Sequence, residues 1–388
     1  MGNTPQTHIV PMNSSPTSVL LLPTLDHLKR VDANGGGCMV FDSSHLRKQA
    51  RIPSQFIWPR NDRLSAIDEL EAPIIDLQGF LHGDETSTLD AAKLVASACT
   101  RHGFFQVTNH GVDTSLVREA FACLDEFFLL PLNEKLRARR KPGSMWGYAG
   151  AHTDRFSSNL PWKETLSFGF DDAGDKAVVA DYMKSQLGNE FEQMGLIYQK
   201  YCEAMRKLSA AIVDLLAISM GVDPSYFRDF FDESSSIMRC NYYPSCQEPE
   251  LALGTGPHTD PTSLTILQQD QVGGLEVFTD GQWKMISPVR DALVINIGDT
   301  FMALSNGMYK SCLHRAVVNS HRERRSLAFF LCPRSDKMVR PPVELCKTDR
   351  QYPNFTWAQL LQFTQQHYRA DVRTLQAFTQ WLGSNPIC

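Results

Sequence analysis

The sequence predicts an α+β protein with a mainly β core: a double-stranded β-helix, or jelly-roll, with N-terminal and C-terminal helices packed around it. Two observations carry this prediction. After residue 236 the sequence breaks into short, apolar, turn-bounded segments, and eight such segments in about 100 residues are typical of a jelly-roll. Helical periodicity dominates the sequence on either side of that run.

The predicted strands of the jelly-roll are separated by turn-forming residues. They lie near 236–243, 251–256, 264–268, 274–278, 283–286, 292–297, 311–318 and 326–332. Asp280-Gly281 stands between the apolar residues Val277 and Trp283, and this dipeptide favours a tight hairpin turn.

Helices are predicted from apolar periodicity and from end signals. Over 189–220 apolar residues recur in steps of three and four and Gly221 suits the end, so we expect a long helix packed on a sheet. Asp113 suits the N-cap of another helix, and Thr356 with Gln359 forms a candidate capping box. The remaining predicted elements are strands at 73–77 and 104–107 and helices over 90–102, 356–368 and 374–382.

The chain divides into four predicted regions. These are a flexible N-terminal tail (1–50), a mixed, largely helical region (51–225), the jelly-roll (226–340) and C-terminal helices (341–388). The tail is predicted because it is rich in Pro, Ser, Thr, Asn and Gly and lacks sustained periodicity, with a short helix expected near 25–30. Its Gly35-Gly36-Gly37 run is not a phosphate-binding loop, because no Gly-Lys-Ser/Thr follows it.

Charge and composition exclude several classes of partner. Lys and Arg number 38 against 43 Asp and Glu, a net charge of −5, which argues against a nucleic acid or an anionic membrane surface. No apolar run reaches the roughly 20 residues of a membrane span. The 10 cysteines form no CxxC pair and indicate reduced thiols, so we expect a cytoplasmic protein. We further expect a monomer that acts on a small molecule. The basic run 135–141 is interpreted as a solvated helix end.

A His-x-Asp triplet is the most informative feature of the jelly-roll region. In an extended segment His258 and Asp260 point to the same face, and an imidazole beside a carboxylate suits a divalent metal. His314, in a later strand-like run, is the best candidate for a third ligand, and His321 is the next. Two histidines and one carboxylate make the facial triad of non-haem Fe(II) oxygenases. The alternative is a histidine that only bonds its neighbour in a turn.

A predicted anion site follows the third ligand. Arg324 and Ser326 alternate at the start of an apolar strand, where a guanidinium can bind a carboxylate bidentately. Asn241 and Tyr243 share the same spacing one hairpin before the triplet, and Tyr243 could add a hydroxyl or be core. A 2-oxoacid fits this layout, because its keto-acid end can chelate iron while the distal carboxylate of 2-oxoglutarate meets Arg324, Ser326 and Tyr243.

These residues resemble the plant 2-oxoglutarate/Fe(II)-dependent dioxygenases. Asn241-Tyr242-Tyr243-Pro244, His258-x-Asp260, His314 and Arg324-x-Ser326 match that family position by position, and the resemblance covers 72–185 and 236–334. It implies that the jelly-roll region is the catalytic domain. It also implies Fe(II) as cofactor, 2-oxoglutarate and dioxygen as cosubstrates, and ascorbate as the reductant that keeps the iron reduced.

A narrower resemblance concerns the substrate. Leu160-Pro161-Trp162-Lys163-Glu164-Thr165, together with 254–274 and 296–307, is similar to the members of this family that oxidise carbon-20 of gibberellins. The resemblance implies successive oxidation of twenty-carbon gibberellins to nineteen-carbon lactones, with Trp162 and Lys163 at the substrate.

Two departures and three alternatives accompany that resemblance. Ser245 replaces an expected proline and Met308 an expected basic residue, and neither is a predicted ligand. The first alternative is a related plant oxygenase acting on another gibberellin position or on a flavonoid. The second is a metal-free jelly-roll binding protein. In the third, Trp162 is ordinary core and Lys163 pairs with Glu164 or solvent.

Overall fold

The computed structural model describes residues 41–153, 155–156, 158–171, 177–346, 349–367 and 373–384. Met39–Cys388 cluster as one compact unit, which is the part described below. Among the described residues, no helix is both long and apolar enough to cross a membrane. The predicted tail segment 1–40, with its glycine run and its expected helix near 25–30, lies outside the described residues.

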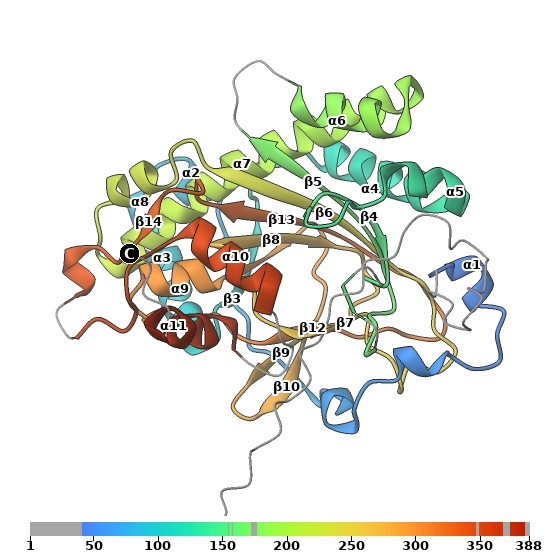
Figure 1. The fold of residues 1–388 in the computed structure, drawn as a ribbon. Coiled ribbons are helices and arrows are strands. Elements are labelled where there is room, and N and C mark those ends of the chain that lie inside the picture. Colours follow the sequence, from blue (N-terminus) through green and yellow to red (C-terminus); the bar gives the residue numbers. More distant parts are fainter. Residues whose placement is uncertain are drawn as a thin grey trace, which may run out of the picture. The chain divides into compact units, whose positions relative to one another are not determined.

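Two sheets form the centre of this unit, and a separate two-stranded sheet is the third (Figure 1). In spatial order the larger sheet contains β2 (Ile74–Asp76), β3 (Phe104–Thr108), β11 (Leu293–Ile297), β8 (Leu264–Gln269), β13 (Arg324–Cys332), β6 (Ser235–Tyr243), β5 (Glu164–Asp171) and β4 (Gly147–Gly150). The smaller sheet contains β1 (Asp68–Glu69), β10 (Gln282–Ile286), β9 (Leu275–Thr279), β12 (His314–Ala316) and β7 (Thr255–His258). β14 (Met338–Val339) pairs with β15 (Phe355–Thr356).

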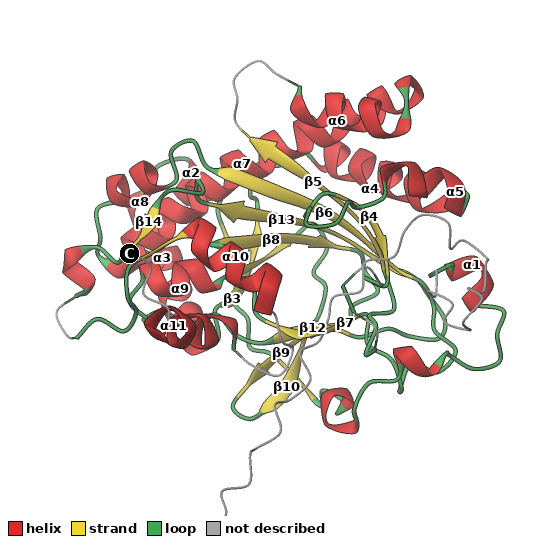
Figure 2. Cartoon of the chain, in the orientation of Figure 1, coloured by secondary structure: helices red, strands yellow, loops and turns green. Residues whose placement is uncertain are grey.

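Helices gather on one side of the larger sheet and at its end (Figure 2). They are α1 (Ser43–Leu46), α2 (Gln78–Leu81), α3 (Glu85–Arg101), α4 (Thr114–Leu129), α5 (Leu132–Lys135), α6 (Val178–Leu187), α7 (Glu192–Met220), α8 (Pro224–Phe230), α9 (Asp299–Leu304), α10 (Trp357–His367) and α11 (Thr374–Ser384). Short 3-10 turns lie at Ser54–Phe56, Arg60–Arg63, Leu136–Ala138, Asn189–Phe191 and Val343–Leu345. The long α7 packs on α3, α4 and the sheet strands β8 and β13, so the predicted supporting helix is confirmed.

The larger sheet has one apolar face and one polar face. Side chains alternate along each strand, and one set is buried in the main core with α7: Leu166, Phe168, Met238, Cys240, Ile266, Leu327 and Phe329. The other set contains Thr165, Ser167, Arg239, Asn241, Thr265, Gln269, Arg324 and Ser326. Of these, Thr265 hydrogen-bonds Asp260, which follows β7 of the smaller sheet, so the polar face points between the sheets. Burying polar side chains between two sheets costs free energy unless they find hydrogen-bond or ionic partners, so this face indicates a binding site.

Most predicted elements are confirmed. Asp113 caps α4 through the amide of Ser115, and the Thr356–Gln359 capping box is present at the start of α10. Asp280 and Gly281 both adopt positive φ, 51° and 78°, in the turn between β9 and β10.

The strand expected at 251–256 is misplaced, because β7 runs from Thr255 to His258. The carbonyls of Leu251 and Leu253 instead accept hydrogen bonds from the amides of Trp58 and Trp162. These contacts join residues that are far apart in sequence, so the local sequence pattern does not indicate them.

The flexible tail expected over 1–50 is wrong for residues 41–50. Phe41 is 1% exposed, and its ring lies 5.6 Å from that of Phe56 and 5.6 Å from that of Trp162. Asp42 then caps α1 by accepting from the amide of Ser44 at 3.0 Å. The burial of Phe41 orders a segment whose composition alone resembles a tail.

The interpretation of 135–141 as a solvated helix end is also wrong at its first residue. Lys135 is buried, and its Nζ donates to Oε2 of buried Glu164 at 2.5 Å and to the carbonyl of Phe128 at 3.3 Å. The hydroxyl of Tyr148 donates to the same carboxylate oxygen at 2.8 Å. This network joins α5, β4 and β5 and fixes the strand that carries the Trp-Lys-Glu segment.

Lys135→Met is expected to destabilise the fold strongly. The substitution leaves the Glu164 carboxylate buried with the Tyr148 hydroxyl as its remaining donor, and breaking a buried ion pair typically costs about 3–5 kcal/mol. Denaturant unfolding measures the effect. Lys93→Met is the control, since Lys93 forms an exposed pair with Asp90 and should change stability by less than about 1 kcal/mol. Equal losses in both variants would show that the buried network does not stabilise the fold.

Candidate metal centre

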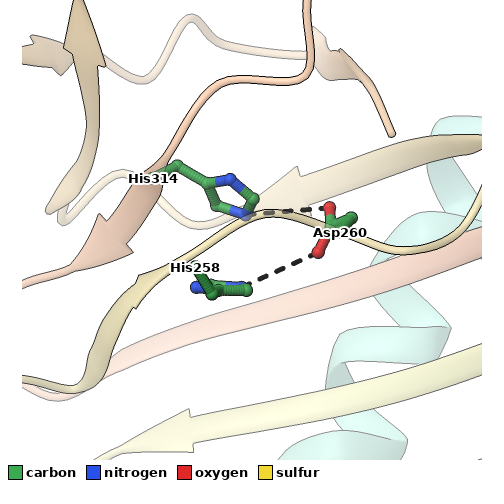
Figure 3. Close-up of side chains that lie close together, drawn as sticks. All are labelled: His258, Asp260 and His314. Atoms are coloured by element: carbon green, nitrogen blue, oxygen red, sulfur yellow. Dashed lines mark ion pairs between the residues drawn. The ribbon is translucent and has the colours of Figure 1, made fainter. Parts of the chain in front are cut away.

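The structure brings His258, Asp260 and His314 together between the two sheets (Figure 3). One potential ligand atom from each residue lies within 4.8 Å of the other two. Nε2 of His258 is 3.7 Å from Oδ1 of Asp260, and Nε2 of His314 is 3.7 Å from Oδ2 of the same carboxylate. His321, the alternative third ligand, is exposed and is not part of this cluster.

Strand pairing explains why residues so far apart in sequence converge. β7 and β12 are antiparallel neighbours, and His258 and His314 are register partners, which places their ring centroids 4.2 Å apart. Asp260 follows β7 after one intervening residue, so its side chain returns to the same face. Local spacing therefore positions two of the three groups, and the sheet register positions the third.

Hydrogen bonds orient both imidazoles toward the carboxylate. Nδ1 of His258 donates to the carbonyl of Gly256 at 2.9 Å, and Nδ1 of His314 donates to the carbonyl of Cys312 at 3.2 Å. This tautomer leaves each Nε2 with a free lone pair facing Asp260. Burial, followed by the proximity of His314, lowers the pKa of His258 to about 3, so its imidazole is neutral at neutral pH, as a metal ligand must be.

Asp260 is buried but held in its ionised form. Burial raises the pKa of its carboxyl, but the two histidines and two hydrogen bonds outweigh burial and keep it below the usual value. Those bonds come from Oγ1 of Thr265 at 2.7 Å and Nδ2 of Asn296 at 2.9 Å, both to Oδ2. A buried set of two imidazoles whose Nε2 atoms face one carboxylate fits Fe(II) in a facial triad.

The predicted anion residues line the adjacent part of the larger sheet. Arg324 pairs with Tyr243 and Ser326 pairs with Asn241 across β13 and β6, so the four side chains share the polar face. Nδ2 of Asn241 donates to Oγ of Ser326 at 3.2 Å, and the Arg324 guanidinium lies 5.0 Å from the centre of the Tyr243 ring.

The buried environment of Arg324 is suited to binding an anion. It is 2% exposed, and its Nη2 donates to Oε1 of Gln269 at 2.9 Å. Within the described part of the chain, Nε of Arg324 and Nε2 of Gln269 are buried without a hydrogen-bond partner. Unpaired buried donors are costly, and a carboxylate would satisfy them, so this end of the sheet fits the distal carboxylate of 2-oxoglutarate.

Sequence reasoning missed three residues of this centre: Thr265, Gln269 and Asn296. Asn296 interrupts the otherwise apolar and buried strand Leu293–Ile297, and such a residue indicates a specific hydrogen bond. Thr265 and Gln269 lie on the same face of β8, four residues apart, so their alternation could have been recognised.

Trp162 does not occupy the position that its resemblance-based role requires. Its side chain is fully buried and packs edge-to-face on Phe56 at 4.9 Å between ring centroids, while its Nε1 donates to the carbonyl of Pro244 at 3.2 Å. With no accessible surface it cannot contact a substrate directly. This burial is what the core alternative predicts for Trp162, and the substrate role that the resemblance implies stays a prediction.

Lys163 points to the polar face, at the end that fits 2-oxoglutarate. Its Nζ donates to Oγ1 of Thr255 at 3.0 Å, the same hydroxyl that Tyr243 contacts at 3.3 Å, and it lies 5.9 Å from the Tyr243 ring centre. Burial, and next the nearby Arg239, lower its pKa well below the usual value. Lys163 pairs with neither Glu164 nor solvent.

Trp162→Ala is expected to lower the free energy of unfolding. Removing a fully buried tryptophan typically costs about 3–5 kcal/mol, and the aromatic cluster around it would lose its centre. Denaturant unfolding should show this loss, and Trp162→Phe should retain much of the stability. Half-saturating concentrations measured under conditions where the variant is folded should change little for either substrate. A selective rise for the organic substrate would reinstate a role in substrate binding.

The jelly-roll fold and the His-Asp-His cluster define the class: a non-haem dioxygenase that uses Fe(II), 2-oxoglutarate and dioxygen. Residues 234–333 match the 2OG-Fe(II) oxygenase superfamily, and residues 72–190 match a region described as non-haem dioxygenase in morphine synthesis N-terminal. Gibberellin 20 oxidase 2 of Oryza sativa subsp. indica is 61% identical over 339 residues, covering 87% of either chain. Gibberellin 20 oxidase 1 of Arabidopsis thaliana is 57% identical over 353 residues, covering 90% of this chain and 93% of that one. The chain therefore belongs to the 2OG-Fe(II) oxygenase superfamily, in the family of the gibberellin 20 oxidases.

Solved structures share the fold. The crystal structure of JOX2 in complex with 2OG, Fe and JA superposes with a TM-score of 0.73 at 30% identity, covering 88% of this chain and 98% of that one. A rice dioxygenase for auxin oxidation superposes with a TM-score of 0.66 at 29% identity, covering 80% and 99%. The predicted fold class is confirmed.

Proposed function

We propose that this dioxygenase converts twenty-carbon gibberellins to nineteen-carbon gibberellin lactones by successive oxidation of carbon-20. The methyl group becomes an alcohol and then an aldehyde, and the carbon is finally lost. The observation that carries the proposal is 61% identity to a gibberellin 20 oxidase in a chain that also assembles the His-Asp-His cluster. Each oxidation would consume one 2-oxoglutarate and one dioxygen and release succinate and carbon dioxide.

In this proposal His258, Asp260 and His314 hold the iron. Iron held there would activate dioxygen, the oxidant, at the expense of 2-oxoglutarate, for attack on an unactivated C–H bond. The carbonyls of Gly256 and Cys312 accept from Nδ1 of the two imidazoles and so orient each Nε2 toward Asp260. Thr265 and Asn296 hold the carboxylate rotamer, and such supporting hydrogen bonds typically strengthen metal binding by about 10–100-fold.

Arg324 and Ser326 would bind the distal carboxylate of 2-oxoglutarate, with Tyr243 and Asn241 beside them. The buried Arg324 supplies the charge, and Gln269 holds its guanidinium in place. The Ser326 hydroxyl is oriented by Asn241. Lys163 donates to the Thr255 hydroxyl next to Tyr243 and so belongs to this end of the site. We also propose a cytoplasmic monomer that uses ascorbate as reductant.

A product assay tests the proposal. Purified protein would be supplied with Fe(II), 2-oxoglutarate, ascorbate and a panel of twenty-carbon gibberellins, with and without hydroxylation at carbon-13. We expect nineteen-carbon lactones that depend on 2-oxoglutarate. Ring hydroxylation with carbon-20 untouched, or oxidation of a flavonoid alone, would replace this function by one of the alternatives and leave the iron chemistry standing.

A further inference from the structure

The polar face of the larger sheet carries a third cation that the iron and 2-oxoglutarate sites do not use. Arg324 and Lys163 both lie beside the Tyr243 ring and so share one end of the sheet. Arg239 lies on the same face of β6, four residues before Tyr243, which corresponds to about 13 Å along a strand. Arg239 and Arg324 therefore stand in different rows of the sheet, with the Asn241–Ser326 pair between them.

Arg239 has no carboxylate partner among the described residues. Its Nε donates to Oγ of Ser167 at 3.0 Å, and its guanidinium lies 5.4 Å from the centre of the Phe330 ring. Burial, and next the neighbouring Arg140 and Arg155, lower its pKa to about 10 although the Asp260 carboxylate acts in the opposite direction, and the side chain stays charged at neutral pH. A cation kept among other cations in a protein interior is costly unless an anion binds to it.

The accessible positions of this face cluster around Arg239. β5, β6 and β13 are otherwise buried apart from strand ends and Arg325, yet Gly169, Arg239 and Phe330 each remain partly accessible. Gly169 and Phe330 are both register partners of Ile237, two residues from Arg239. We call Gly169, Arg239, Phe330 and Trp146 the Arg239 patch.

Trp146 covers the glycine of this patch. A Cβ atom at Gly169 would lie 3.1 Å from the Trp146 ring, and Trp146 remains 36% exposed. The patch therefore offers two aromatic rings and one guanidinium. Phe330 pairs with Thr265 across β13 and β8, and Thr265 holds Asp260, so the patch adjoins the metal centre. An apolar polycycle bearing a carboxylate matches that combination of surfaces.

We propose that Arg239, oriented by Ser167, binds a carboxylate of the organic substrate while Trp146 and Phe330 contact its ring system. This inference rests on the proposed function, and it adds the residues that make the site specific for a carboxylic acid. The product chemistry agrees, because a lactone can close only if the substrate carries a carboxylate. Each of the two substrates then has its own cation: Arg324 for 2-oxoglutarate and Arg239 for the gibberellin.

Binding measured without turnover tests the inference. Equilibrium dialysis under anaerobic conditions, with Fe(II) and 2-oxoglutarate present, would compare a twenty-carbon gibberellin as the free acid and as its fully methylated ester. Arg239→Met should weaken binding of the acid by at least about tenfold and hardly affect the ester, since the lost interaction is charge-assisted. Arg239→Lys should recover part of the affinity for the acid. Arg228→Met is the control, because Arg228 pairs with Asp214 at an exposed position and should behave as wild type.

The outcomes separate this inference from the proposed function. Equal weakening of acid and ester binding would reduce Arg239 to a packing role and overturn the inference, as would unchanged binding of both. A selective rise in the half-saturating 2-oxoglutarate concentration of Arg239→Met would assign the patch to the cosubstrate instead. If the wild-type protein converts the acid and Arg239→Met binds it normally, the inference alone fails. If the wild-type protein binds neither form, the proposed function fails with it.

Discussion

Asp260→Ala, His258→Ala and His314→Ala are each expected to abolish turnover while leaving the fold largely intact. A facial triad has no spare protein ligand, and among the described residues these three side chains form the one group of at least three His, Cys, Asp or Glu close enough to hold a metal. Of the three substitutions, Asp260→Ala should disturb the site most. The Asp260 carboxylate faces both imidazoles and accepts hydrogen bonds from Thr265 and Asn296. Its loss leaves two buried donors unpaired, at about 1–3 kcal/mol each.

Two measurements check this expectation. Metal binding followed by calorimetry with Fe(II) or Mn(II) under anaerobic conditions should be lost or strongly weakened, and 2-oxoglutarate-dependent oxygen uptake should vanish. Thermal unfolding shows whether each variant is folded, and Asp260→Asn keeps the volume at that position if alanine proves too disruptive. His321→Ala is the matched control, since His321 is exposed and should leave both readouts unchanged. Substantial activity in His314→Ala would exclude His314 as a ligand.

The parts of this site that follow from local spacing could be predicted from the sequence. His258 and Asp260 share a face because they are two residues apart in extended backbone, and the same spacing governs Arg324 with Ser326 and Asn241 with Tyr243. The structure adds the register that pairs Arg324 with Tyr243 and Ser326 with Asn241. His314 was predicted as a strand residue of the right chemistry, and the β12–β7 pairing brings it to His258.

The parts that failed depend on contacts between distant segments. The motif resemblance places Trp162 at the substrate, and it gives no sign of the burial by Phe41 and Phe56, which lie more than 100 residues away in sequence. Charged runs are usually solvated, so the sequence predicts a solvated Lys135. In the structure Lys135 is buried, because it forms an ion pair with Glu164 on β5. Arg239 carried no signal at all, since an arginine within a predicted strand reveals its face only when β5 and β13 are aligned beside it.

Arg324→Met is expected to raise the half-saturating concentration of 2-oxoglutarate by more than tenfold. Methionine keeps most of the length and the contact with the Tyr243 ring but removes the charge, and losing one partner of a buried charge pair typically costs about 2–5 kcal/mol. Oxygen uptake at varied 2-oxoglutarate measures the effect. Lys337→Met is the control, because Lys337 is distant in the fold and donates to a backbone carbonyl at an exposed position.

The same variant distinguishes the two cations of the polar face. Arg324 is 2% exposed, and among the described residues its side chain hydrogen-bonds the neutral amide of Gln269 and no carboxylate, so its charge is available to an incoming carboxylate. Arg239 lies further along β6, beside the row that holds Asp260, and has its own aromatic surroundings. Arg324→Met should therefore leave the affinity for the free-acid gibberellin nearly unchanged, and Arg239→Met should leave that for 2-oxoglutarate nearly unchanged. An unchanged 2-oxoglutarate requirement in Arg324→Met would show that the distal carboxylate binds elsewhere, with Lys163 as the nearest remaining cation beside Tyr243.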